Sequence, residues 1–251
     1  MKQRPTFPAQ LELTLVKNRP SARGAAALAV NLPVTAAAPT GPRAHMVQLL
    51  QKQGVTDPAV LHAMGTVERH RFVDSALVSQ AYEDTSLPIG LGQTISKPGV
   101  VSRMAELLRH GASGKLGRVL EIGTGCGYQA AVLSLLASEV YSIERLRGLH
   151  DKARENLRHL RLPNVHLLFG DGMQGYAKGA PYAAIIAAAG GEAVPQAWLD
   201  QLAVGGRLVA PVATGDSAGT QALLVLDKTV QGIRKTLLEP VHFVPLKSGV
   251  A

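Results

Sequence analysis

Residues 118–144 read RVLEIGTGCGYQAAVLSLLASEVYSIE, and this stretch predicts the fold of the chain. Arg118 to Ile122 is a short apolar run rich in branched residues, and glycines at 123, 125 and 127 interrupt it. Tyr128 to Ala137 then has helical spacing, and Val140 to Ile143 is a second apolar run. We therefore predict a strand, a tight turn, a helix and a second strand.

The turn has the features of a ligand site. Gly123, Gly125 and Gly127 lack a Cβ, so the backbone can take positive φ angles and lie directly against a ligand. The helix behind the turn points unpaired N–H groups at the same ligand. Glu144 ends the second strand about 20 residues beyond the glycines, where nucleotide-binding βαβ units place a ribose-binding carboxylate. The stretch therefore predicts a nucleotide-like cofactor.

The following residues extend this unit into a doubly wound α/β sheet. We expect helices at 148–160 and 194–202, and strands at 165–169, 182–189 and 206–212. Two further extended runs, 222–226 and 241–245, have no helix between them, which predicts an antiparallel end to the sheet. Ligands of such sheets bind at the carboxyl ends of the strands.

The residues before the glycine unit form an N-terminal helical addition to the sheet. Helices are expected at 45–53, at 58–67 with Asp57 as N-cap, and within 68–81. Residues 82–98, YEDTSLPIGLGQTISKP, form a loop of about 17 residues, and loops of this length are often functional. A helix that ends at Gly111 follows this loop. Ser96 lies just before this helix, so it could cap the helix or contact a ligand, and both interpretations stay open here.

Composition limits the classes of function. The 251 residues carry a net charge of +8, and residues 1–43 alone hold six basic residues against one acid. The basic character therefore belongs largely to the N-terminal region, and nucleic acid is not an expected partner. We expect a basic, disordered extension at 1–42, rather than a signal peptide, and one domain at 43–251. Residues 43–110 would hold the helices and the substrate loop, and residues 111–251 the cofactor-binding sheet.

The single cysteine also narrows the possibilities. Cys126 cannot form an internal disulfide or a cysteine-based zinc cluster, which fits a reducing, cytoplasmic compartment. No partner base is visible for it, so we expect a packing role in the crowded turn rather than a nucleophile. No apolar run approaches the roughly 20 residues that cross a bilayer, and neither a metal nor a membrane is expected.

The acids around the turn discriminate between two cofactors. A dinucleotide would bring a pyrophosphate next to Glu121, which would repel it, whereas the ammonium and sulfonium groups of S-adenosylmethionine would be attracted. Glu144 can accept hydrogen bonds from both ribose hydroxyls, and Asp171 can accept one from the adenine amino group. The residues therefore favour S-adenosylmethionine.

Four segments together resemble protein-L-isoaspartate O-methyltransferases: EIGTGCGYQAAVL, YEDTSLPIGLGQTISKP, FGDG and VHFVPL. The resemblance covers residues 43–248 and implies the Rossmann-like fold of class I methyltransferases. It also implies transfer of a methyl group from S-adenosylmethionine to the α-carboxyl of L-isoaspartyl residues in damaged proteins. The resulting ester would collapse to a succinimide. The implied enzyme is expected to be a monomer.

The resemblance also assigns roles to residues. Thr94, Ile95 and Ser96 would bind the substrate carboxylate, with Ser96 as the active-site serine. The implied cofactor-binding residues are Glu121, Gly123, Thr124, Gly125, Gly127, Glu144, Asp171 and Gly172. Two positions depart from the family pattern. Ala183 stands where the family commonly has an aspartate, and Gly99 stands where the family often has a larger aromatic or histidine ring.

Two alternatives remain open from the sequence. One is an S-adenosylmethionine-dependent methyltransferase that acts on RNA or a small molecule, which would share the glycine turn but would not require the 82–98 loop. The other is a non-catalytic binding protein that has kept the fold.

Overall fold

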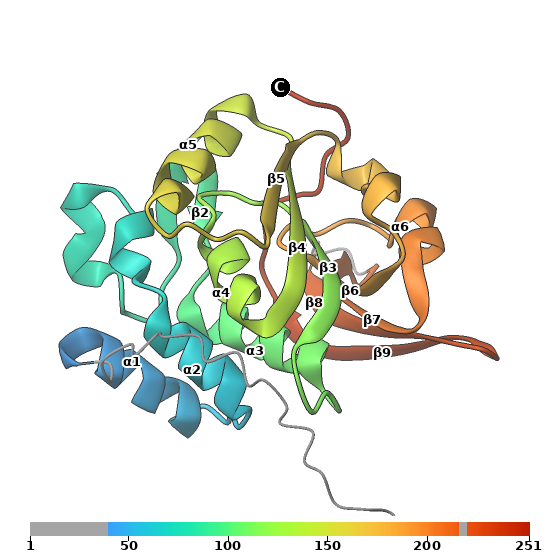
Figure 1. Ribbon diagram of the computed structural model, residues 1–251, viewed down its shortest axis with the longest axis horizontal. Coiled ribbons are helices and arrows are strands. Elements are labelled where there is room, and N and C mark those ends of the chain that lie inside the picture. The colour runs from blue at the N-terminus through green and yellow to red at the C-terminus, as the bar shows by residue number, and fades with distance from the viewer. Residues whose placement is uncertain (1–39, 216–219) are drawn as a thin grey trace, which may run out of the picture. The chain divides into compact units, whose positions relative to one another are not determined.

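A single seven-stranded sheet forms the centre of the fold in the computed structural model, which describes residues 40–215 and 220–251 (Figure 1). The strand order is β5-β4-β3-β6-β7-β8-β9; the pairs from β5 to β7 are parallel, and β8 and β9 are added antiparallel. The strands are β3 (Leu116–Ile122), β4 (Ala137–Glu144), β5 (Val165–Phe169), β6 (Tyr182–Ala187), β7 (Leu202–Ala213), β8 (Gln221–Thr229) and β9 (Gly232–Val241). The predicted doubly wound sheet with an antiparallel end is confirmed.

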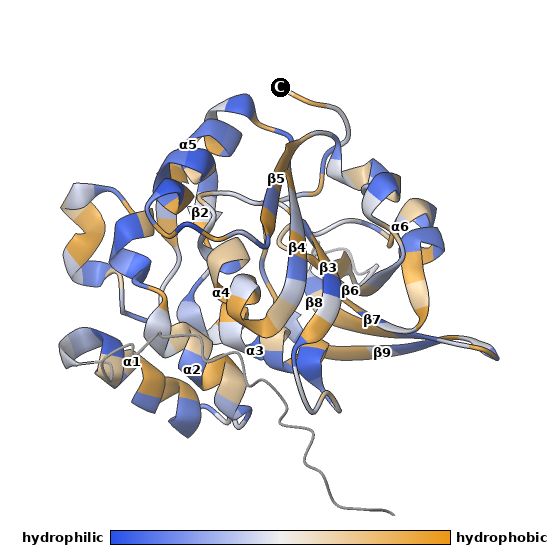
Figure 2. Ribbon diagram, in the orientation of Figure 1, coloured by the Kyte–Doolittle hydropathy of each residue, from blue (hydrophilic) through white to orange (hydrophobic). Residues whose placement is uncertain are grey.

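Helices cover both faces of the sheet. One face packs against α3 (Pro98–Arg109) and α4 (Tyr128–Leu136), and the other against α6 (Gln196–Gln201). Side chains alternate between the two faces along each strand, so Val119 belongs to the first core and Leu120 to the second. Both faces are therefore apolar. The outer helix α5 (Arg147–Arg158) instead carries many hydrophilic residues, as Figure 2 shows.

The N-terminal helical addition is also present. It consists of α1 (Gly41–Lys52), α2 (Pro58–Thr66) and two 3₁₀ helices, η1 (Arg69–Phe72) and η2 (Ser75–Gln80). The apolar side chains of α1 and α2 share one core with α4. Within the described residues, no helix is both long and apolar enough to cross a membrane. The expected N-terminal extension lies outside the described residues, except for Thr40 and the first two residues of α1.

Two segments differ from the sequence-based expectation. Residues 82–98 are not a loop throughout, because β1 (Leu87–Gly90) and β2 (Gln93–Ile95) pair there as an antiparallel hairpin. The last strand of the sheet is β9, which ends at Val241, rather than the expected run 241–245. In that run, Pro245 forms an isolated bridge to Gly190. The edge strand β9 escaped prediction because it is mostly exposed and carries charged residues, so it lacks an apolar run.

Asp57 joins the helical addition to α3. Its Oδ1 accepts hydrogen bonds from the backbone N–H groups of Ala59 (2.8 Å) and Val60 (3.3 Å), which confirms the predicted N-cap of α2. Its Oδ2 accepts a hydrogen bond from Nε of the buried Arg109 at 2.8 Å. Burial raises the pKa of Asp57, but the hydrogen bonds from Arg109 and Ala59 outweigh it and hold the pKa below its usual range.

Replacement of this carboxylate should destabilise the protein. We expect Asp57→Ala to lower the free energy of unfolding at pH 7 by about 3 kcal/mol, because it removes the cap and leaves a buried guanidinium without its carboxylate. Asp57→Asn keeps a capping oxygen and should lose less. Since the folded-state pKa is depressed, the stabilisation exists above about pH 4 and disappears as the pH falls through the folded pKa. Urea denaturation at pH 7 and pH 3 measures both effects, and equal stability of wild type and Asp57→Ala at pH 7 would refute this role.

Candidate active site

The glycine turn follows β3 and has the predicted backbone conformation. The φ angles of Gly123, Gly125 and Gly127 are 90°, 57° and 91°. The amides of Gly123 and Thr124 both donate to the carbonyl of Ile143, at 2.9 and 3.2 Å, so the turn is anchored to β4. A Cβ on Gly127 would lie 3.0 Å from Leu157 Cδ1, so this glycine allows α4 to pack against α5.

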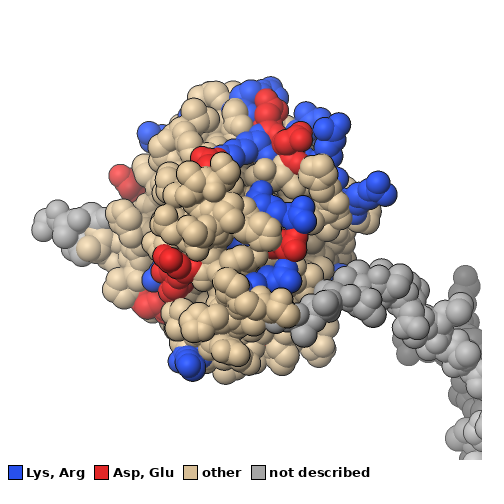
Figure 3. All heavy atoms as spheres, turned by 90° about the vertical axis from the view of Figure 1, so that its left-hand side faces the viewer, with Lys and Arg blue, Asp and Glu red and all other residues tan. Residues whose placement is uncertain are grey.

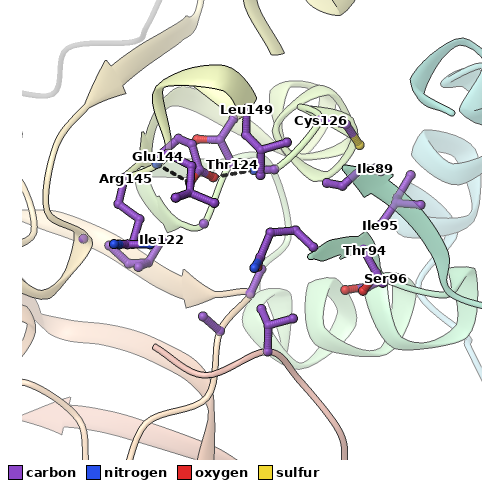
Figure 4. Close-up of a pocket in the computed structure, with 18 of the residues that line it drawn as sticks. Ile89, Thr94, Ile95, Ser96, Ile122, Thr124, Cys126, Glu144, Arg145 and Leu149 are labelled. Atoms are coloured by element: carbon purple, nitrogen blue, oxygen red, sulfur yellow. Dashed lines mark hydrogen bonds between the residues drawn. The ribbon is translucent and has the colours of Figure 1, made fainter. Parts of the chain in front are cut away.

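Glu144 links the turn to the following helix. Its Oε2 accepts a hydrogen bond from the Gly125 amide at 2.8 Å, and its Oε1 accepts one from the Leu146 amide at 2.9 Å (Figure 4). The side chain is buried, yet it lines a cavity. Each carboxylate oxygen has two lone pairs, so Glu144 can still accept hydrogen bonds from a ligand.

This first cavity, which we call the donor cavity, has a volume of about 480 Å³. That size lies in the range of small-molecule sites. Figure 4 shows Glu144 and Arg145 at one end and Thr94 and Ser96 at the other. Of the residues expected to bind cofactor or substrate, it is lined by Thr94, Ile95, Ser96, Gly123, Thr124, Gly125, Glu144 and Gly172.

Three of the expected cofactor-binding residues do not line this cavity: Glu121, Gly127 and Asp171. Direct contact of these side chains with a ligand is therefore not supported. Gly127 packs between helices, as described above. The other two have distinct structural positions.

Glu121 lies behind the turn rather than in the cavity. Its side chain is fully buried and accepts a hydrogen bond of 2.5 Å from the Ser142 hydroxyl, which lies 2.6 Å from the hydroxyl of Thr124. Burial raises the pKa of Glu121 to about 8, although the hydrogen bond from Ser142 lowers it. Glu121 therefore supports Thr124, which does line the cavity.

Asp171 is engaged by the chain itself. Its Oδ1 accepts a hydrogen bond from the Met173 amide at 2.9 Å, and its Oδ2 accepts one from the Gly249 amide at 2.7 Å. The second bond comes from a C-terminal segment, 246–251, that also pairs with Arg145: the Ala251 amide donates to the Arg145 carbonyl at 2.8 Å. Asp171 thus positions this segment beside the cavity.

Sequence reasoning missed several lining residues. Arg145, Leu146 and Leu149 follow Glu144 at the start of α5, and Leu246 and Lys247 belong to the C-terminal segment. The predicted helix at 148–160 includes Leu149, but helical spacing does not indicate a ligand. The VHFVPL segment carried the only sequence signal for the C-terminal contribution.

The hairpin carries the three expected substrate residues. Ile95 is buried and ends β2, whereas Thr94 is exposed and Ser96 half-buried. Ser96 does not cap α3: the N-cap residue is Lys97, and the Gly99 amide donates instead to Asp84 Oδ1 at 2.7 Å. Within residues 40–215 and 220–251, the Ser96 hydroxyl forms no hydrogen bond, so it is available to a ligand.

A second cavity, which we call the acceptor groove, adjoins the first and measures about 700 Å³. Four residues line both cavities: Thr94, Ser96, Ala188 and Val244. The groove contains two ion pairs, Arg103 with Glu239 at 2.7 Å and Lys97 with Asp84 at 3.9 Å. A Cβ on Gly99 would lie 2.9 Å from Asp84 Oδ1, so the glycine at this atypical position leaves room for the carboxylate that caps α3.

Cys126 has the packing role expected from the sequence. It is 2% exposed, and burial raises the pKa of its thiol to about 11, so the thiol stays protonated at neutral pH. Across the described ranges, no three His, Cys, Asp or Glu side chains are grouped as metal ligands would be.

Comparisons with known proteins identify the family of this chain. A family model described as protein-L-isoaspartate(D-aspartate) O-methyltransferase matches residues 36–251. A protein-L-isoaspartate O-methyltransferase of Leptothrix cholodnii is 61% identical over 213 residues, which cover 84% of this chain and 75% of that protein. A protein of the same description from Methylibium petroleiphilum is 60% identical over 209 residues, covering 82% of this chain and 77% of that protein.

Two solved structures share the fold. A protein-L-isoaspartate O-methyltransferase is 28% identical with a TM-score of 0.74, and the match covers 83% of this chain and 67% of that one. A Plasmodium falciparum structure in complex with S-adenosyl-L-homocysteine is 24% identical with a TM-score of 0.69, and the match covers 83% of this chain and 99% of that one. The family match and the two relatives at about 60% identity show that this chain belongs to the protein-L-isoaspartate(D-aspartate) O-methyltransferase family.

Proposed function

We propose that this chain transfers a methyl group from S-adenosylmethionine to the α-carboxyl of L-isoaspartyl residues in damaged proteins. The observation that carries the proposal is the junction of the two cavities, where Thr94 and Ser96 line both. A methyl donor in the first cavity and a polypeptide in the second would meet at these hydroxyl groups.

The residues of the donor cavity fit S-adenosylmethionine. A Cβ on Gly125 would lie 3.2 Å from Ile89 Cδ1, so the glycine keeps open the space between the turn and the hairpin. Gly123, Thr124, Gly125, Glu144 and Gly172 would hold the donor, with Glu144 accepting from its ribose hydroxyls. Glu121 and Asp171 would act indirectly, through Thr124 and the C-terminal segment. When bound, S-adenosylmethionine supplies an electrophilic methyl group.

The acceptor needs orientation rather than a base. A free α-carboxyl has a pKa of about 3.5, so it is already ionised at neutral pH. The Ser96 hydroxyl would donate a hydrogen bond to one carboxylate oxygen and thereby aim the other at the donor cavity. Ile89, Ile95 and Leu149 line that cavity with apolar surface and would limit the access of water. Catalysis would therefore depend mainly on proximity and orientation.

We further propose that the chain acts as a monomer in the cytoplasm, without nucleic acid as partner. Figure 3 shows acidic and basic side chains interspersed on one face of the molecule, rather than basic ones alone. Methyl transfer from labelled S-adenosylmethionine to an isoaspartyl peptide, to its aspartyl twin and to RNA tests the proposed acceptor. Labelling of the isoaspartyl peptide alone supports it, and labelling of RNA alone would refute it.

Ser96→Ala should separate catalysis from donor binding. Because the hydroxyl has no partner within the described chain and would bind a charged carboxylate, we expect kcat/KM for the isoaspartyl peptide to fall about 10- to 100-fold. The Kd for S-adenosylmethionine and the Tm should change little. The exposed Ser75, which lines neither cavity, provides the control Ser75→Ala. Unchanged turnover in Ser96→Ala would reject the catalytic role.

Glu144→Gln should weaken donor binding. The amide nitrogen of glutamine would have to face either the Gly125 or the Leu146 N–H, so one donor would lose its acceptor. We expect the Kd for S-adenosylmethionine, measured by calorimetry, to rise at least about 10-fold. Glu139→Gln, on the same strand but half-exposed and paired with Arg118, serves as control and should leave the Kd unchanged. Equal donor affinity in Glu144→Gln and wild type would contradict the assigned role.

A further inference from the structure

Leu91 occupies an unusual position at the tip of the β1–β2 hairpin. Gly90 pairs with Gln93, so Leu91 and Gly92 alone form the loop, and their φ angles are 52° and 69°. A two-residue hairpin loop with positive φ at both positions is the type I′ geometry, which favours Asn-Gly. A leucine in the left-handed region is strained, because its Cβ approaches the following carbonyl oxygen.

The Leu91 side chain buries little apolar surface on folding, so packing does not compensate for the backbone strain. Leu91 is 63% exposed. Within the described hairpin, residues 87–95, it is the only large apolar side chain that is exposed. Its Cδ1 would lie 3.1 Å from a Cβ on Gly148, so it reaches across to the first turn of α5. Neither local conformation nor core packing therefore explains a leucine here.

The hairpin is held firmly over the donor cavity. Lys152 of α5 donates from Nζ to the Ile89 carbonyl at 3.0 Å and pairs with Asp74 at 2.9 Å. Leu91 is thereby kept between the hairpin and the first turn of α5, the helix that follows Leu146 and carries Leu149. All three leucines line the donor cavity. Leu91 does not line the acceptor groove.

We propose that Leu91 is a donor-binding residue, whose apolar side chain closes over S-adenosylmethionine between the hairpin and the start of α5. The inference rests on the proposed function. Binding of the donor would bury the apolar surface that the free chain leaves exposed, which offsets the backbone strain. The contact is with the donor rather than with the acceptor polypeptide, because only the first cavity includes Leu91.

Leu91→Asn tests this with two opposite readouts. Asparagine tolerates the left-handed conformation, so the Tm of the free protein should rise by a few degrees. The same variant lacks the apolar contact, so the Kd for S-adenosylmethionine, measured by calorimetry, should rise about 10-fold. The KM for the isoaspartyl peptide at saturating donor should stay within about twofold of wild type, because the acceptor groove is untouched.

Leu91→Met is the matched control. It keeps an apolar side chain of similar volume at the same strained position, so its donor Kd should stay within about threefold of wild type. A Leu91→Asn protein that binds the donor as tightly as wild type overturns the inference and leaves the proposed function intact. A wild-type protein that binds S-adenosylmethionine but methylates no isoaspartyl peptide overturns the proposed acceptor and leaves the donor contact standing. A wild-type protein that binds no donor overturns both.

Discussion

The carboxylate of Glu144 makes the contacts on which the rest of the site depends. Its two oxygens bind the amides of Gly125 and Leu146, and so join the glycine turn to the start of α5. Both amides lie between regular elements, where no carbonyl of a strand or helix accepts a hydrogen bond from them. A buried N–H group without an acceptor lowers the stability of the fold. One side chain therefore fixes the distance between the turn and α5, and with it one end of the donor cavity.

The position of the hairpin follows from that of α5. Lys152 on α5 holds the Ile89 carbonyl, and Gly148 in the first turn of the helix accommodates Leu91. Because β1 and β2 are paired, the hairpin presents Ile89 and Leu91 to the donor cavity and Ser96 to the junction with the acceptor groove. A single short element thus contributes to both sites. The tertiary position of Ser96 is set through a chain of contacts that starts at Glu144.

The position of each acid along its strand explains why Glu144 lines the donor cavity and Glu121 does not. Glu121 lies within β3, and like Val119 its side chain points to the face that α3 and α4 cover, so it is buried against Ser142. Glu144 is the last residue of β4, where the strand gives way to a turn and the side chain reaches the donor cavity. The sequence marks both as acids near strand ends. In the sheet Glu121 lies opposite Ser142, which is two residues before Glu144 and on the same face. The distance from the end of the strand, rather than the face, therefore places one carboxylate behind the turn and the other in the cavity.

The sequence by itself determined the βαβ unit, the positive φ angles of its glycines, the Asp57 cap and the antiparallel end of the sheet. These features depend on local sterics and on the spacing of apolar residues, which a single sequence displays. Only the tertiary structure showed that Asp84 caps α3 in place of Ser96, that Asp171 binds the C-terminal segment, and that the two cavities meet at Thr94, Ser96, Ala188 and Val244. Side-chain direction and partners are set by packing between segments far apart in the chain, and no local pattern encodes that packing.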